Sequence, residues 1–201
     1  MTELLAFIGL GFHHIVSAEA ADHILFLLAL AAIYRARDWR DALWVVSAFT
    51  VGHSITLALA VTGTLTLPTP WIEFLIPVTI VATGIENLLV RDRPRTLWHG
   101  RYRPMFSGVF GLVHGAGFAN YLQRLFVEHV AVPLLGFNVG VELGQVVVLL
   151  AAAAALGALD RVLERLPWRL PRPRALRLRV VGVSVVVIVI AAQWATQRTP
   201  W

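Results

Sequence analysis

Residues 42–61 read ALWVVSAFTVGHSITLALAV, and this stretch decides the fold class. It contains no aspartate, glutamate, lysine or arginine. Its length matches the roughly 20 helical residues needed to cross a bilayer core of about 30 Å. His53 lies near its middle. The stretch therefore predicts a transmembrane helix that carries an ionisable group at membrane depth.

The rest of the chain repeats this pattern. Further apolar runs of similar length cover residues 71–90, 105–126, 131–156 and 180–196. Another crossing is predicted near residues 18–34, after a short helix near residues 4–17 that lies at the interface or dips into the membrane. We expect an all-α fold, a polytopic membrane helix bundle of six transmembrane helices plus this N-terminal interfacial or re-entrant helix. Residues 1–201 would form a single integral membrane domain.

The composition excludes an ordinary soluble domain. Hydrophobic residues make up 58% of the chain and charged residues 14%, against about 45–50% and about 25% in soluble domains. Mean hydropathy is +0.72. The net charge of +5 comes from arginine, since the chain has no lysine. Most of the arginines lie between the apolar runs, which indicates cytoplasmic loops and no nucleic-acid partner.

The arginines also predict the orientation. They cluster within residues 35–40, 91–103 and 161–179, which are alternate connections between the runs. The connections at residues 62–70 and 127–130 contain none. Because positive charge stays on the cytoplasmic side, both termini are predicted to lie outside.

Three runs carry an ionisable side chain near their centre, namely His53, His114 and Glu142. Burying such a group in a bilayer costs several kcal/mol, so each is a functional hypothesis. Either histidine alone is equally explained as a core residue bonded to a neighbouring hydroxyl. The coincidence of all three favours one shared intramembrane site.

Further polar residues follow the same helix faces. Those on the faces of His53 and Glu142, with one near the inner end of residues 71–90, are candidate pathway residues: Thr50, Ser54, Asn138, Gln145 and Glu86. Gly136, Gly140 and Gly144 line the side opposite Glu142. This spacing predicts close packing against another helix.

A second group of candidate ligands precedes and begins the first predicted crossing, and consists of His14, Glu19, Asp22 and His23. Carboxylates and imidazoles suit nickel, cobalt, zinc or manganese. Copper(I) is disfavoured because cysteine is absent and methionine occurs only twice. The candidate metal ligands are therefore His14, Glu19, Asp22, His23, His53, His114 and Glu142.

Four segments resemble signatures of the HupE/UreJ membrane proteins. They are Asp22–Leu28, with the pattern DHxLFLL, residues 49–57, with FTxxHSxTL, residues 110–119, with FGLxHGxGFA, and residues 137–145, with FNxGVExGQ. The resemblance covers about residues 11–150. In the family a histidine usually lies closer to the Asp-His pair, with a glycine between them. Here His14 is followed by a longer spacer without glycine, so either His14 or Glu19 completes the outer group.

The resemblance implies a metal-related role, because family members accompany nickel hydrogenases and ureases. A transition-metal permease of a bacterial inner membrane is the leading hypothesis, with nickel ranked before cobalt and zinc. An intramembrane metal-dependent hydrolase is the second hypothesis. The third is a non-catalytic assembly factor for a membrane metalloenzyme. The expected partners are the bilayer, the metal ion and a metalloenzyme maturation system.

Overall fold

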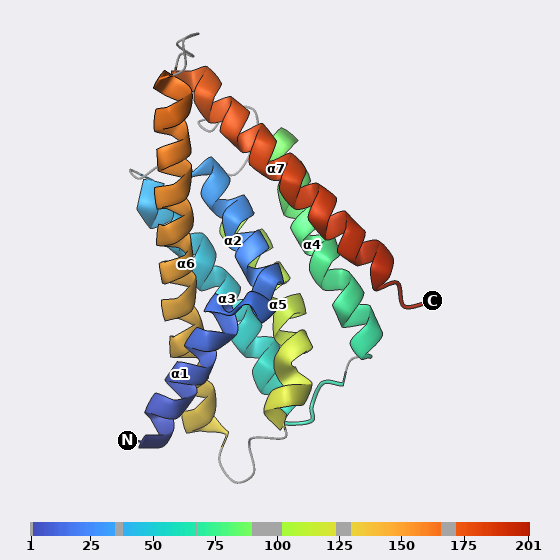
Figure 1. Ribbon diagram of the computed structural model, residues 1–201. Helices are drawn as coiled ribbons and strands as arrows, with labels where there is room; N and C mark the ends of the chain where they lie inside the picture. The colour runs from blue at the N-terminus through green and yellow to red at the C-terminus, as the bar shows by residue number, and fades with distance from the viewer. Residues whose placement is uncertain (1, 35–37, 67, 90–101, 124–129, 166–171) are drawn as a thin grey trace.

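The computed structural model describes residues 2–34, 38–66, 68–89, 102–123, 130–165 and 172–201, and these contain helices and no strand. The all-α prediction is confirmed. The helices in chain order are α1 (Thr2–Val16), η1 (Ala18–Ala20), α2 (Ala21–Ile33), α3 (Trp39–Val61), α4 (Thr69–Leu89), α5 (Tyr102–Gln123), α6 (Ala131–Arg165) and α7 (Arg172–Gln197). Figure 1 shows that they form one elongated bundle.

Glycines bring two pairs of helices into backbone contact. A Cβ atom built on Gly140 of α6 would collide with the Ile8 carbonyl of α1, and one on Gly144 would lie 2.8 Å from the Ile15 Cβ atom. In the same way, a Cβ on Gly52 of α3 would overlap the Gly108 carbonyl of α5. The predicted close packing through the glycine ridge of α6 is confirmed, and its partner is α1.

The structure corrects the expected beginning of the bundle. α2 has 13 residues, which span only about 20 Å and cannot cross a bilayer core alone. α1 does not lie apart at an interface, because Gly136, Gly140 and Gly144 pack it lengthwise on α6. α1 and α2 are long and apolar enough to cross a membrane only when they are taken together, with a bend of 56° between them. Both run the same way along the bundle in Figure 1, so we describe them as one broken span.

Four single helices of the described residues are long and apolar enough to cross a membrane, and these are α3, α4, α6 and α7. The α1–α2 pair would make a fifth crossing. α5 has 22 residues but is less apolar, since it carries arginine, histidine, asparagine and glutamine. Six crossings therefore remain a prediction. Both described chain ends lie toward the same end of the bundle, opposite the helix ends that flank the arginine-rich connections (Figure 1).

Side chains from α4, α6 and α7 hold the C-terminal end of α2. Asn87 of α4 donates to the Ala29 carbonyl at 2.8 Å. Buried Arg179 of α7 donates to the Ala32 carbonyl at 3.1 and 3.2 Å and pairs with Asp160 of α6. The bonds from Arg179 satisfy the Ala32 carbonyl, which the end of α2 leaves without an intrahelical partner, and Asn87 adds a second acceptor contact at Ala29. The C-terminal half of the broken span is thus fixed to its neighbours by polar contacts.

Candidate metal centre

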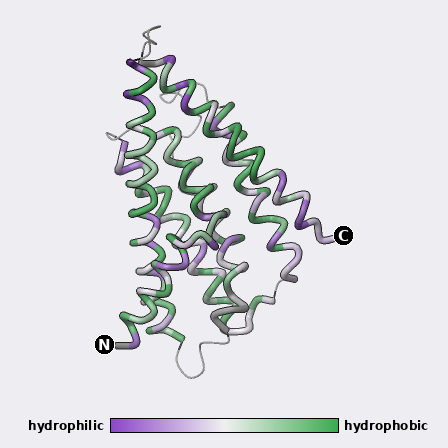
Figure 2. Tube along the Cα trace, in the orientation of Figure 1, coloured by the Kyte–Doolittle hydropathy of each residue, from purple (hydrophilic) through white to green (hydrophobic). Residues whose placement is uncertain are grey.

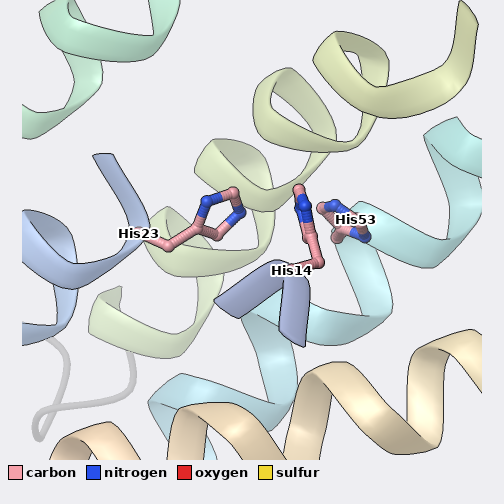
Figure 3. Close-up of side chains that lie close together, drawn as sticks. All are labelled: His14, His23 and His53. Carbon is pink, nitrogen blue, oxygen red and sulfur yellow. The ribbon is translucent and has the colours of Figure 1, made fainter. Parts of the chain in front are cut away.

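Three imidazoles from three helices meet inside the bundle. They belong to His14 of α1, His23 of α2 and His53 of α3, and one ring nitrogen from each lies within 4.8 Å of the others. Figure 3 shows the three rings beside one another. His53 is fully buried and His23 is 4% exposed. Figure 2 shows hydrophilic positions on the trace at this depth, where α1 meets α2, between hydrophobic segments.

A second set of candidate ligands shares His23. The carboxylate of Asp22, His23 and His114 of α5 also offer ligand atoms within 4.8 Å of one another. The ring centroids of His23 and His114 are 5.2 Å apart. The two sets are therefore adjacent and joined through one imidazole, so His23 is available to an ion in either set.

The break between α1 and α2 places His14 next to His23. α1 ends at Val16, two residues after His14, and Asp22 and His23 lie in the first turn of α2. The rings of His14 and His23 consequently lie 4.9 Å apart, despite the eight residues between them. Glu19 is exposed and belongs to neither set. Of the two alternatives left open by the sequence, the structure brings His14 to the Asp-His pair.

Asp22 orients the imidazole of His23. Its Oδ1 atom accepts from the His23 backbone N–H at 2.8 Å and lies 3.0 Å from the ring Nδ1 atom. A carboxylate at this position favours the tautomer with the proton on Nδ1, which leaves a lone pair on Nε2. Histidines that bind metals are commonly held by a carboxylate in this way.

Five ring nitrogens of the cluster have no hydrogen-bond partner within the described residues. They are Nε2 of His14, Nε2 of His23, both nitrogens of His53, and Nδ1 of His114. Buried polar atoms in proteins are nearly always bonded, because each unsatisfied atom costs about 1–3 kcal/mol. A cation bound between deprotonated ring nitrogens would satisfy several of them at once.

Phenylalanine rings cover the imidazoles. Phe118 lies 4.0 Å from the ring of His14, and Phe137 stacks on His53 at 6.3 Å between centroids. Phe49 lies 5.1 Å from His114, and Phe26 lies 5.9 Å from it. Phe26 and Phe49 are both buried. Apolar rings of α2, α3, α5 and α6 therefore pack directly against the imidazoles.

An open cavity of about 660 Å³ reaches the cluster. Its wall includes His14, Asp22, His23 and His114, whereas His53 does not line it. The remaining wall comes from α1, η1, the start of α4 and the ends of α5 and α7, and includes Glu19, Glu73, Trp194 and Arg198. We call this space the outer cavity. It connects the Asp22–His23–His114 set with the end of the bundle where the two chain termini lie.

The structure corrects the position expected for Glu142. Its carboxylate accepts a hydrogen bond from the Ser47 hydroxyl of α3 at 2.5 Å and belongs to neither ligand set. One turn further along both helices, Thr50 donates to the Gln145 side chain at 2.8 Å. The face shared by Glu142 and Gln145 was predicted correctly, but it meets α3 beside Ser47 and Thr50. His53 and His114 do contribute to the cluster.

The remaining predicted pathway residues lie outside the cluster. Ser54 donates to the Thr50 carbonyl at 2.6 Å, and Asn138 donates to the Leu134 carbonyl at 2.9 Å. Glu86 pairs with Arg103 at 2.7 Å and accepts from the Tyr102 hydroxyl. The sequence reasoning missed Thr79, whose hydroxyl lies 3.2 Å from His114 Nε2. Its spacing from Thr83, one helical turn away, was the available signal.

A comparison with protein-family models gives a match to the HupE / UreJ protein family over residues 1–198. The chain belongs to the HupE/UreJ family. The match extends the resemblance found in the motifs to nearly the whole length, including α7. The chain matches no curated protein and no solved structure. Membership in the HupE/UreJ family supports a metal-handling role in a membrane, and the histidine cluster supplies residues that could bind the metal.

Proposed function

We propose that this HupE/UreJ protein is a transition-metal permease, with nickel as its first candidate ion and cobalt or zinc as alternatives. The observation that carries the proposal is the buried cluster of imidazoles at the break of a span, reached by the outer cavity. Broken helices commonly form the ion sites of membrane transporters, because substrates bind where helix ends meet inside the bilayer.

The donor set selects the class of ion. Imidazole nitrogen suits nickel, cobalt and zinc, whereas magnesium and calcium require oxygen ligands. Metal–nitrogen bonds of about 2.1 Å keep two ligands of one ion within about 4.2 Å. The ligand atoms of the cluster lie within 4.8 Å of one another, so small side-chain rotations bring them to bonding distance. Neutral ligands also bind weakly enough for the release that a permease requires.

The two ligand sets give the ion an order of contacts. In this proposal an ion enters through the outer cavity and first meets Asp22, His23 and His114. It then passes to His14, His23 and His53, with His23 common to both positions. Movement beyond this point requires displacement of Phe26 and Phe49. The Thr50–Gln145 and Ser47–Glu142 contacts between α3 and α6 are the next polar groups on the face of His53.

Neighbouring histidines provide a matched test. His14 belongs to the cluster, whereas His13 is exposed and belongs to neither ligand set. We expect His14→Gln to weaken nickel binding by purified protein by about 10- to 100-fold and to abolish nickel uptake into proteoliposomes. His13→Gln should retain both activities. Equal behaviour of the two variants, whether both active or both inactive, would contradict the proposed site.

One observation favours a second candidate, an intramembrane metal-dependent hydrolase. Three imidazoles leave an open coordination position on a zinc ion, and Asp22 lies beside them on the outer cavity. Zinc in such a site lowers the pKa of a bound water to about 7. Tightly held zinc without uptake would support this alternative, and exchangeable nickel with uptake would support the permease. Absence of metal affinity would leave a role in the assembly of a metalloenzyme.

A further inference from the structure

A hydroxyl group on α4 contacts the only histidine of the second ligand set that no carboxylate orients. Thr79 and His114 are 8% and 1% exposed, and the Thr79 hydroxyl lies 3.2 Å from the Nε2 atom of His114. The same hydroxyl donates to the Ile76 carbonyl at 2.7 Å. Thr79 is outside every set of candidate metal ligands.

The hydrogen-bond inventory of Thr79 determines where the proton of His114 resides. A threonine hydroxyl has one proton and two lone pairs. The shorter contact, to Ile76, uses the proton, because a carbonyl oxygen can only accept. The contact with His114 then requires a proton on Nε2, donated to a lone pair of the hydroxyl. The neutral ring consequently carries its lone pair on Nδ1, which has no partner within the described residues.

We propose that Thr79 is a positioning residue that fixes His114 in the Nε2–H tautomer and so directs its Nδ1 lone pair toward the metal ion. This inference rests on the proposed metal site. His23 is held in the opposite tautomer, since Asp22 contacts its Nδ1 atom. The two imidazoles that meet an ion at the outer cavity therefore present different nitrogens, His23 being held by the preceding residue of α2 and His114 by a residue of α4.

Replacement of Thr79 should change which nitrogen of the His114 ring carries the proton, without removing a metal ligand. Thr79→Val retains the branched shape but leaves a buried N–H group without an acceptor, which is costly. Neither ring nitrogen of His114 then has a hydrogen-bond partner within the described residues, so the preference for the Nε2–H form is lost. A proton on Nδ1 occupies the lone pair that an ion would use. Thr79→Ser restores the hydroxyl. Thr83 is a matched control, because its buried hydroxyl donates to the Thr79 carbonyl at 2.9 Å and contacts no histidine of the cluster among the described residues.

Nuclear magnetic resonance of metal-free protein tests the tautomer directly. Long-range ¹H–¹⁵N correlation of histidine-labelled protein in nanodiscs distinguishes the two neutral forms, and the His114 signals are assigned by their loss in His114→Gln. We expect the Nε2–H form in the wild type, in Thr79→Ser and in Thr83→Val, and a mixture of the Nε2–H and Nδ1–H forms in Thr79→Val. An Nδ1–H ring in the wild type, or an unchanged ring in Thr79→Val, would overturn the proposal.

Nickel titration of the same proteins separates this inference from the proposed function. We expect the dissociation constant of Thr79→Val to rise by about 10- to 100-fold, the range observed when a partner of a metal-binding histidine is lost. Thr79→Ser and Thr83→Val should match the wild type. Wild-type affinity in Thr79→Val would overturn the positioning role. If the tautomers are as expected but wild-type protein binds no nickel, the metal site itself is refuted.

Discussion

Gly144 allows a direct test of how helix packing controls the metal site. Gly144→Ala adds one carbon atom to α6 at a point 2.8 Å from the Ile15 Cβ atom and 3.1 Å from the Phe12 carbonyl oxygen of α1. Ordinary contact begins at 3.4 Å, so the difference between 3.4 and 2.8 Å requires α1 to move by at least 0.6 Å. Ile15 is fully buried and adjacent to His14. The displacement is therefore transmitted to a proposed ligand.

The expected loss of nickel affinity follows from how little the distances between a metal ion and its ligands can vary. Metal–ligand distances hold to within about 0.2 Å, and a shift of 0.6 Å moves His14 beyond this range relative to His23 and His53. We expect nickel affinity to fall by about 10-fold or more. Overpacking should also lower the free energy of unfolding by about 1–3 kcal/mol. Competition with a colorimetric chelator and thermal unfolding in nanodiscs measure the two effects.

Gly157 supplies the control on the same helix. A Cβ atom at Gly157 meets nothing within 4 Å, so Gly157→Ala should leave nickel binding unchanged and stabilise α6 by up to about 1 kcal/mol. Wild-type affinity and stability in Gly144→Ala would refute the reasoning about α1. An equal loss of affinity in both alanine variants would show that the effect does not arise from the α1–α6 contact.

Four further measurements test other parts of the structure. Arg179→Gln should lower the free energy of unfolding by on the order of 3 kcal/mol, because it leaves Asp160 and the carbonyls of α2 unpaired; an unchanged melting temperature would contradict this. Nickel binding should weaken between about pH 7.5 and about pH 5.5, since protons compete for imidazole lone pairs; a flat profile would argue against histidine ligands. Thr64→Cys should react with an impermeant maleimide only from outside, and reaction only from the cytoplasmic side would reject the orientation. Glu142→Gln should slow uptake yet retain nickel binding, and loss of binding would return Glu142 to the ligand set.

Local periodicity predicted which residues share a helix face. Gly140 and Glu142 lie on opposite faces of α6, which follows from the sequence of that helix alone. Both faces are found as expected. The neighbour that each face meets depends on how the helices are arranged, which no local pattern specifies. Glu142 was expected to lie at the same depth as His53 and His114, because all three residues are near the centres of their apolar runs. α6 in fact continues to Arg165, so its predicted centre was displaced from the true one.

The broken span could not be predicted from run lengths for a related reason. Residues 4–34 are too short for two crossings and too long for one straight crossing, and composition does not distinguish an interfacial helix from half of a bent span. The bend depends on contacts made by distant residues, including the α6 glycines and Arg179. Thr79 was missed because its spacing from Thr83 marks one face of a helix but does not show that a histidine of α5 lies beside that face.

The break between α1 and α2 also has a consequence for biogenesis. Each half of this span ends inside the bilayer, where free N–H and C=O groups find no water and are costly to expose to lipid. The bonds that hold α2 come from Asn87 and Arg179, both of which are synthesised after it. The α1–α2 span leaves the ribosome before α4, α6 and α7, yet its final conformation requires them. This span is thus expected to reach its native position only after those later helices are made.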